Sequence, residues 1–403
     1  MPNQIFEKQT KHDSNLEALR GFAATIVVIY HLIIHSSKLN GGFEFKKNII
    51  HWSPSGHLMV LVFFMLSGYV IGKSYANKPN FNTIGYLKKR LIRLYPIYLF
   101  SILFTIALFR EDIRSIIGNI FLVQNLFTNC LTKNDALWSL NHEILYYLFA
   151  ILLLKYKINS QLLLFVFSFL LLATFKIDNI PCIIQDYLVG FIFWLSGYIL
   201  STFNKIDNYK PSVNKLISVM LLLLGCDLLN LFARIVNFNL KIPNQISFYT
   251  LTGIVKIGDF CLFPYALYAV IIFSSINFRY IKILTWFVYL NSIAHLVNLL
   301  FNHSFFKTEM FYIPTVFISL SLFFHFMTKP LRLSLQYMVN LGSISYAIYV
   351  IHYPILYTLS KIKVFTGTTL SYFIRVLIFT GIVILISFLL EKKLQPLIKK
   401  KFT

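Results

Sequence analysis

Residues 15–35 constrain this chain most, because they combine membrane-length apolar sequence with two polar side chains. The segment reads NLEALRGFAATIVVIYHLIIH, with Arg20 near its start and His31 deep inside it. In one helix these side chains would lie within about 20° of the same face and about 16 Å apart along the axis. Charged and titratable groups are costly inside a bilayer, so the pair predicts a functional site. The alternative is that Arg20 reaches the lipid headgroups and His31 forms an interhelical hydrogen bond.

The composition is typical of an integral membrane protein. Of the 403 residues, 57% are hydrophobic and 13% are charged, whereas a soluble globular domain carries about 25% charged residues. We therefore predict an all-α, polytopic bundle of about 10–12 transmembrane helices. The candidate spans are residues 17–36, 57–74, 91–109, 137–155, 161–176, 182–202, 214–234, 259–277, 282–302, 310–327, 338–360 and 372–391. Residues 113–127 are apolar but short, so we expect them to be interfacial or re-entrant.

We expect one membrane domain, at residues 16–391, with a cytoplasmic N-terminal segment at 1–15 and a basic cytoplasmic tail at 392–403. The net charge is +22, and most lysines and arginines lie in loops that face the cytoplasm if both termini are inside. This pattern predicts contact with the lipid bilayer and not with nucleic acid. The start of the chain has no cleavage motif, and the Lys-, Asn-, Ile- and Phe-rich composition is typical of an AT-rich genome. We expect a multi-pass protein of a bacterial inner (plasma) membrane.

The four cysteines give no sign of a metal centre. They are Cys130, Cys182, Cys226 and Cys261, and they are scattered without metal-ligand spacing. We therefore expect buried or loop thiols and no bound metal.

A basic cluster occupies residues 88–96, which read KKRLIRLYP. Arg90 and Arg93 are three positions apart and share a helix face, and paired guanidinium groups can hold a phosphate. Lys89 adjoins them. With the N terminus inside, the cluster lies on the same side of the membrane as Arg20. The alternative is a basic anchor at the membrane surface.

Residues 137–143, LWSLNHE, bring polar groups into the start of another span. Trp138 suits the membrane interface and could stack on a sugar ring, and Ser139 follows it. Glu143 lies about a turn and a half into the span, where a carboxylate is paired or functional. It could orient an imidazole or bind a sugar hydroxyl group; the alternative is a structural pair with a neighbouring helix.

Two more segments combine small and polar residues. Residues 341–354 read LGSISYAIYVIHYP and place His352 at roughly the depth of His31, with Tyr346 on the same segment. Small and hydroxylated residues permit close helix packing, so His352 is either a packing residue or part of a site. Ser67 and Gly68 are interpreted as packing residues that let their span approach the first span.

Taken in chain order, these segments resemble the membrane acyltransferase-3 family. The resemblance covers about residues 14–396 and rests on residues 16–21 with His31, 63–69, 90–96, 138–143, 341–354 and 391–396. Each motif is weak evidence by itself. The match is specific because all of the motifs occur in the same order as in the family. Many relatives carry a fused esterase-like domain, but the only Gly-Asp pair here, Gly258-Asp259, precedes Phe260 and not serine. We therefore expect the stand-alone form.

The resemblance implies transfer of an acetyl group from cytoplasmic acetyl-CoA to a hydroxyl group of a surface polysaccharide or lipid-linked saccharide. It points to Arg20, His31, Arg90 and Arg93 as site residues. On this hypothesis His31 is the general base, directly or through an acyl intermediate, and Arg20 and Glu143 assist it. Arg90, Arg93 and Lys89 would bind the donor phosphates. The residues expected to bind the acceptor are Trp138, Ser139, Tyr346 and His352.

A transporter of a lipid-linked sugar or another anionic substrate is the competing hypothesis. About twelve spans with buried arginine and histidine fit that class as well. Transport would leave no covalent product and would not depend on acetyl-CoA. The enzyme hypothesis also makes a geometric prediction: His31 should face the interior of the bundle, with a route to it from Arg90 and Arg93.

Overall fold

A computed structural model describes residues 13–76, 81–174, 181–205, 211–240, 257–329 and 331–402. Within these ranges the chain is helical, and its β-type pairing is limited to two isolated bridges. The predicted all-α, polytopic membrane fold is therefore confirmed. The predicted segment 1–15 lies mostly outside the described residues. Only its last three positions are seen, where Asp13 precedes the first helix.

Among the described residues, eight helical segments are long and apolar enough to cross a membrane. They contain α1 (Ser14–Ile34), α4 (Gly56–Tyr75), α5 (Thr83–Leu108), α7 (Trp138–Tyr156), α9 (Cys182–Leu200), α14 (Ile281–Phe301), α15 (Tyr312–Phe326) and α18 (Thr369–Leu389). Helices α16 (Gln336–Gly342) and α17 (Ser345–Ser360) are together long and apolar enough to form a ninth span. They are bent by 72° relative to each other, so this span would be a broken one.

Shorter helices complete the bundle. They are α2 (Ser36–Leu39), α3 (Phe45–Asn48), α6 (Ile113–Ile120), α8 (Ser160–Ala173), α10 (Val213–Gly225), α11 (Leu231–Leu240), α12 (Ile257–Phe260), α13 (Phe263–Ser274) and α19 (Gln395–Phe402). The basic tail continues α18 through a π-helical turn at Leu390–Leu394 into α19.

All twelve predicted spans coincide with helix, but three of the helices are short. The predicted spans 161–176, 214–234 and 259–277 correspond to α8, α10 and α13, which have 14, 13 and 12 residues. Helix α10 ends at Gly225, well before the predicted end at residue 234. The polar segment 282–302 is instead one continuous helix, α14, because its polar side chains find partners: Asn291 donates to Tyr265 at 2.8 Å.

Reciprocal glycines hold α4 and α9 in direct backbone contact. A Cβ atom on Gly68 would lie 1.9 Å from the Trp194 carbonyl oxygen, and one on Gly197 would lie 1.9 Å from the Met65 oxygen. Glycine is therefore needed on both sides of the crossing. Helix α4 does pack against α1, as expected, but the position of a Gly68 side chain is occupied by α9.

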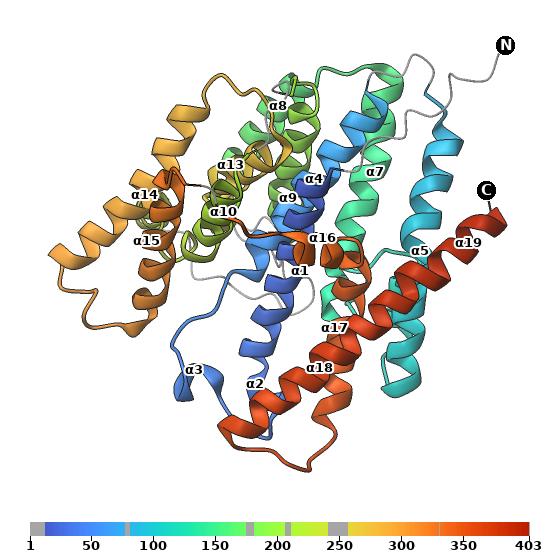
Figure 1. Cartoon of the computed structure of the whole chain (residues 1–403). Helices are drawn as coiled ribbons and strands as arrows, with labels where there is room; N and C mark the ends of the chain where they lie inside the picture. Colours follow the sequence, from blue (N-terminus) through green and yellow to red (C-terminus); the bar gives the residue numbers. More distant parts are fainter. Residues whose placement is uncertain are drawn as a thin grey trace.

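A second pair of glycines joins α1 to α16. A Cβ atom on Gly21 would lie 2.0 Å from the Met338 oxygen, and one on Gly342 would lie 1.9 Å from the Glu17 oxygen. Helix α1 (dark blue in Figure 1) thus runs beside α16 and α17 from the far end of the sequence. This crossing brings the bend between α16 and α17 to the Arg20 end of α1.

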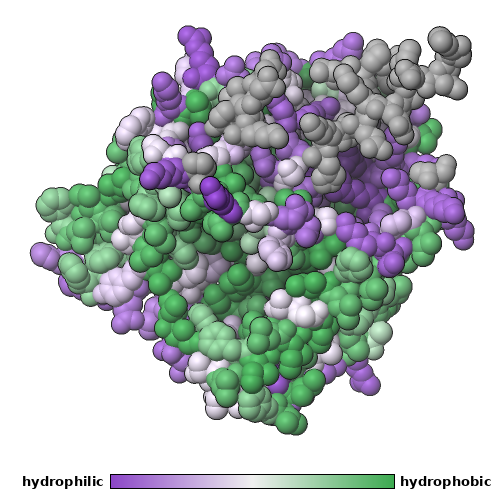
Figure 2. Space-filling view, viewed as in Figure 1, coloured by the Kyte–Doolittle hydropathy of each residue, from purple (hydrophilic) through white to green (hydrophobic). Residues whose placement is uncertain are grey.

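The outer surface of the bundle is suited to lipid. Hydrophobic residues cover the middle and lower parts of the face in Figure 2, and hydrophilic residues gather along its upper margin. Large apolar side chains on several helices are exposed, including Phe165, Trp286, Phe323 and Leu377. A soluble monomer rarely exposes apolar surface of this extent, whereas a bilayer covers it.

The α4–α9 crossing predicts a sharp penalty for a single added methyl group. Replacing Gly197 with alanine must push the two helices apart, which costs about 1–3 kcal/mol. We expect Gly197→Ala to unfold at a lower temperature than the wild type in detergent. Gly381→Ala on α18 is the control, because nothing lies within 4 Å of the position of its Cβ atom. Equal unfolding temperatures for both variants would contradict the close crossing.

Candidate functional site

Three adjoining cavities follow α1 from Arg20 to His31. The arginine mouth, of about 270 Å³, is lined by Glu17, Arg20, Arg93, Gly342, Ser343, Ser345, Tyr346, Glu391 and Lys392. The central cavity, of about 90 Å³, shares Arg20, Arg93, Ser345 and Tyr346 with the mouth. The histidine cavity, of about 170 Å³, contains His31 and shares Val60 and Tyr349 with the central cavity. His31 therefore lines a cavity inside the bundle.

His31 is held by His352, which comes from α17. The Nδ1 atom of His31 lies 3.0 Å from Nε2 of His352. The other nitrogen of His352 lies 2.7 Å from the carbonyl oxygen of Tyr349, which can only accept a hydrogen bond. Neutral His352 therefore carries its proton on Nδ1 and accepts at Nε2 from the Nδ1–H of His31. This leaves the lone pair of neutral His31 on Nε2, the atom that a general base needs.

Aromatic rings fix the position of the His31 imidazole. The ring centre of Tyr353 lies 4.8 Å away and that of Tyr30 lies 5.0 Å away, both edge-on. His35, one turn along α1, is stacked at 6.0 Å. Its Nε2 atom lies 2.8 Å from the Tyr353 hydroxyl oxygen. These contacts restrict the ring, as a catalytic imidazole requires.

Glu143 belongs to the central cavity. Its carboxylate accepts hydrogen bonds from Ser67 Oγ, at 3.1 Å, and from the Tyr147 hydroxyl group. Among the hydrogen bonds of the described residues none joins Glu143 to His31, and the two residues line different cavities. The residue that orients the His31 imidazole by a hydrogen bond is therefore His352 and not Glu143. Ser67, interpreted from the sequence as a packing residue, also lines the central cavity, which sequence reasoning missed.

The two arginines of the basic cluster differ in exposure, because Arg90 is buried and Arg93 is exposed. The guanidinium carbon of Arg90 lies 5.5–5.7 Å from the ring centres of Tyr75, Tyr86 and Tyr147. This side chain is buried, and its Nε atom has no hydrogen-bond partner among the described residues. Arg93 is exposed and lines both the mouth and the central cavity. A buried donor without a partner is the position that an anionic ligand would satisfy.

The other predicted donor-side residues are distributed unevenly. Arg20 donates to Glu17 at 2.5 Å while lining both the mouth and the central cavity. Lys89 is exposed and lines none of the three cavities. Lys392, from the basic tail, lines the mouth. Lys392 belongs to the EKKLQP segment that resembles the family's closing motif. Only the folded structure shows that this segment lies beside Arg20.

The residues predicted to bind an acceptor divide between two cavities. Trp138 lines the histidine cavity. Ser139 and Tyr346 line the central cavity, where Ser139 is hydrogen-bonded to the Tyr349 hydroxyl group at 2.8 Å and Tyr346 donates to the Leu94 carbonyl at 2.9 Å. His352 is fully buried and acts on the site by holding His31.

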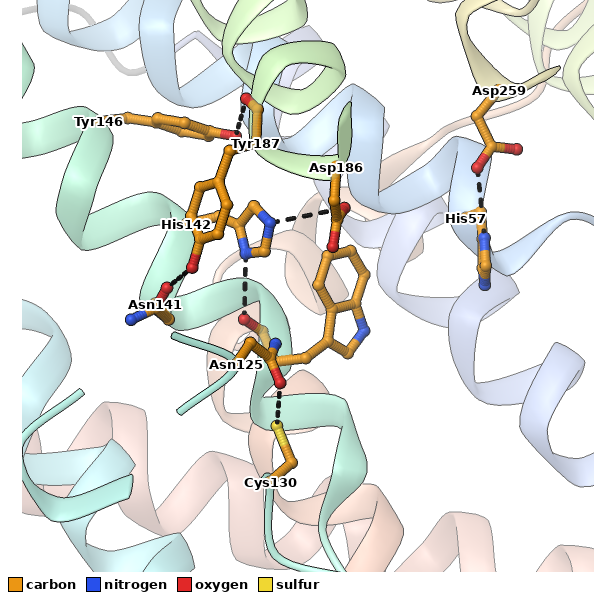
Figure 3. A network of polar contacts seen from close by, with 10 residues as sticks. His57, Asn125, Cys130, Asn141, His142, Tyr146, Asp186, Tyr187 and Asp259 are labelled. Carbon is orange, nitrogen blue, oxygen red and sulfur yellow. Dashed lines mark hydrogen bonds and ion pairs between the residues drawn. The ribbon is translucent and has the colours of Figure 1, made fainter. Parts of the chain in front are cut away.

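A separate histidine–aspartate pair is formed by His142 and Asp186 (Figure 3). His142 and Asp186 are both almost completely buried, with 3.5 Å between His142 Nε2 and Asp186 Oδ1. The ring of Tyr187 stacks on that of His142 at 3.9 Å. His142 Nδ1 lies 3.3 Å from the Trp138 carbonyl oxygen. Neither member lines any of the three cavities.

The described part of the chain offers no metal centre, since no group of three histidine, cysteine, aspartate or glutamate residues is arranged to hold an ion. Cys130, Cys226 and Cys261 are free and buried thiols.

Comparison with known proteins identifies the family. The family model for the acyltransferase domain of acyltransferase 3 proteins matches residues 13–297, more than two thirds of the chain. The chain therefore belongs to the acyltransferase 3 family of membrane proteins. No curated protein and no solved structure matches it. The matched range holds Arg20, His31 and Arg90, and the structure adds α17 with His352 from outside that range.

Partial burial of His35, just beyond the end of α1, predicts that the stability of the fold depends on pH. Burial lowers the pKa of His35 from 6.5 to about 4, and Lys38 acts in the same direction. The unfolded chain therefore binds more protons between these values, and stability falls as the pH falls through that window. We expect a smaller fall in unfolding temperature from about pH 7.5 to about pH 5 for His35→Gln than for the wild type. Equal falls would contradict a neutral, half-buried His35.

Proposed function

We propose that this chain is an O-acyltransferase that transfers an acetyl group from acetyl-CoA to a hydroxyl group of a surface polysaccharide or lipid-linked saccharide. The observation that carries the proposal is that His31, held by its hydrogen bond to the buried His352, lines a cavity that adjoins, along α1, a second cavity lined by arginines. An oriented neutral imidazole and a phosphate-binding entrance are the two parts that this reaction requires. Family membership favours group transfer over the transport alternative.

The donor would enter through the arginine mouth. Arg20, Arg93 and Lys392 line this entrance, and Arg90 lies deeper, where its Nε atom is buried. These cations would hold the phosphate groups of CoA, while its pantetheine arm extends past Glu143 toward His31. Lys89 would contribute at most long-range charge, because it lines none of the cavities. We place the mouth and the N terminus on the cytoplasmic side of a bacterial plasma membrane, in agreement with the positive-inside rule.

The transfer step uses the lone pair on His31 Nε2. His31 removes the proton from the acceptor hydroxyl group while the hydroxyl oxygen attacks the thioester carbonyl carbon. The C–S bond then breaks, and the proton held by His31 passes to the departing CoA sulfur. His352 accepts a hydrogen bond from His31 Nδ1–H throughout and stabilises the imidazolium form. Trp138 and Tyr353 provide flat rings against which a sugar can stack.

Removing the His31 imidazole should abolish transfer. We expect His31→Ala to lower the rate of glycan acetylation about 10²–10⁴-fold, the usual contribution of a general base. The measurement is incorporation of isotope-labelled acetyl groups into the surface glycan by mass spectrometry, at matched expression. His303→Ala is the control, since that side chain is exposed on a loop. Full acetylation in the His31→Ala variant would refute the mechanism, and transport of an unmodified saccharide would support the competing hypothesis.

Loss of Arg93 should weaken donor binding selectively. Hydrogen bonds to charged groups contribute about 1.5–3 kcal/mol, so Arg93→Ala should raise the KM for acetyl-CoA about tenfold or more, with a smaller effect on kcat. Steady-state kinetics in lipid nanodiscs would measure this. Lys88→Ala, at an exposed position away from the cavities, is the matched control. An unchanged KM in Arg93→Ala would contradict the assignment of the mouth to the donor.

A further inference from the structure

The cavities along α1 differ in charge. The mouth and the central cavity are lined by Arg20, Arg93 and, in part, Arg90 and Lys392. Within the described part of the chain no arginine or lysine lines the histidine cavity; its polar lining includes one carboxylate, three imidazoles and three tyrosine hydroxyl groups. Such a lining suits the hydroxyl groups of an uncharged saccharide and not a phosphate.

His57 is a further imidazole of this cavity that has a hydrogen-bonding partner. It lies in the first turn of α4, and its Nδ1 atom is 3.4 Å from Oδ2 of Asp259 on α12 (Figure 3). A carboxylate accepts, so Nδ1 carries the proton, and the neutral ring has its accepting lone pair on Nε2. Figure 3 shows that second nitrogen on the side of the ring away from Asp259. His57 lines the histidine cavity together with His31.

One aromatic ring connects the two imidazoles. Tyr30 contacts His31 with ring centres 5.0 Å apart and His57 with ring centres 6.4 Å apart, edge-on in both cases. The Tyr30 ring fits here because Gly56 has no side chain: a Cβ atom on Gly56 would lie 2.5 Å from Tyr30 Cδ1. Both histidines are thus held around one ring, each with Nδ1 engaged by a partner, His352 or Asp259.

We propose that His57, oriented by Asp259, binds a second hydroxyl group of the acceptor, so that the histidine cavity selects a saccharide that presents two hydroxyl groups at once. One hydroxyl group donates its proton to His31 Nε2 and reacts. The other donates a hydrogen bond to His57 Nε2 and remains unmodified. His57 is on this assignment a substrate-binding residue and Asp259 a positioning residue. The inference rests on the proposed acyltransferase function.

The test separates acceptor binding from chemistry. The purified full chain in lipid nanodiscs is given labelled acetyl-CoA and, as acceptor probe, surface glycan of the source cells from which alkali has removed the O-acetyl groups. Loss of one hydrogen bond should raise the KM for this glycan about tenfold in His57→Ala, with kcat and the KM for acetyl-CoA nearly unchanged. Asp259→Ala should give the same rise, and the double variant should add little to it.

Conservative variants and a control make the result specific. His57→Gln and Asp259→Asn each retain a hydrogen-bond acceptor at the required position and should recover part of the affinity for the glycan. His51→Ala is the matched control, because His51 is exposed and pairs with Glu309 at 3.5 Å outside the cavity. Unfolding temperatures identify any variant that fails to fold. If an alanine variant fails to fold, the KM for the glycan in the conservative variants decides whether His57 binds the acceptor.

Each outcome bears on one proposal. An unchanged KM for the glycan in folded His57→Ala and Asp259→Ala would overturn the role of His57 while leaving acyl transfer intact. A fall in kcat without a change in KM would also overturn it. Absence of glycan acetylation by the wild-type chain would instead refute the proposed function.

Discussion

The backbone contact between α1 and α16 is the constraint on which the rest of the site depends. Gly21 and Gly342 let the two helices touch, and the chain then bends by 72° into α17. The bend begins at the level of Arg20, so the next turns of α17 run along the same stretch of α1 as far as His31. Tyr346 therefore reaches the arginine end, and His352 reaches His31 two turns further. A bulkier residue at either glycine would separate every one of these pairs.

The low dielectric of a membrane favours polar groups that have defined partners. Two buried arginines differ in this respect. Arg375 donates to the carbonyl oxygens of Leu39, Val364 and Ile362, so its charge has a structural explanation. Arg90 is surrounded by aromatic rings but keeps a buried nitrogen without a partner among the described residues. The second pattern is the one expected where a ligand supplies the missing acceptor.

The same distinction applies to the histidines, and it explains how far sequence reasoning could go. His31 was identifiable because an imidazole in an apolar run, on the face of Arg20, has few structural reasons to be there. His352 was ambiguous, since its own segment is rich in packing residues; only contact with His31 shows its role. Ser67 and His57 gave no usable signal, because a single serine within a helix, or a single histidine in a first turn, is common. Their partners, Glu143 and Asp259, are 76 and 202 positions away.

By itself the sequence determined the membrane environment, the all-helical fold and the approximate positions of the spans, and it proposed Arg20, His31, Arg90 and Arg93 as candidate site residues. These features depend on hydrophobicity and on helical periodicity, which are local properties of the chain. Only the tertiary structure decided that His352 and not Glu143 holds His31, that Gly68 faces α9, and that Lys392 joins the arginines while Lys89 does not. Those outcomes depend on which helices touch, and helix contacts are set by the steric fit of small residues from distant parts of the chain.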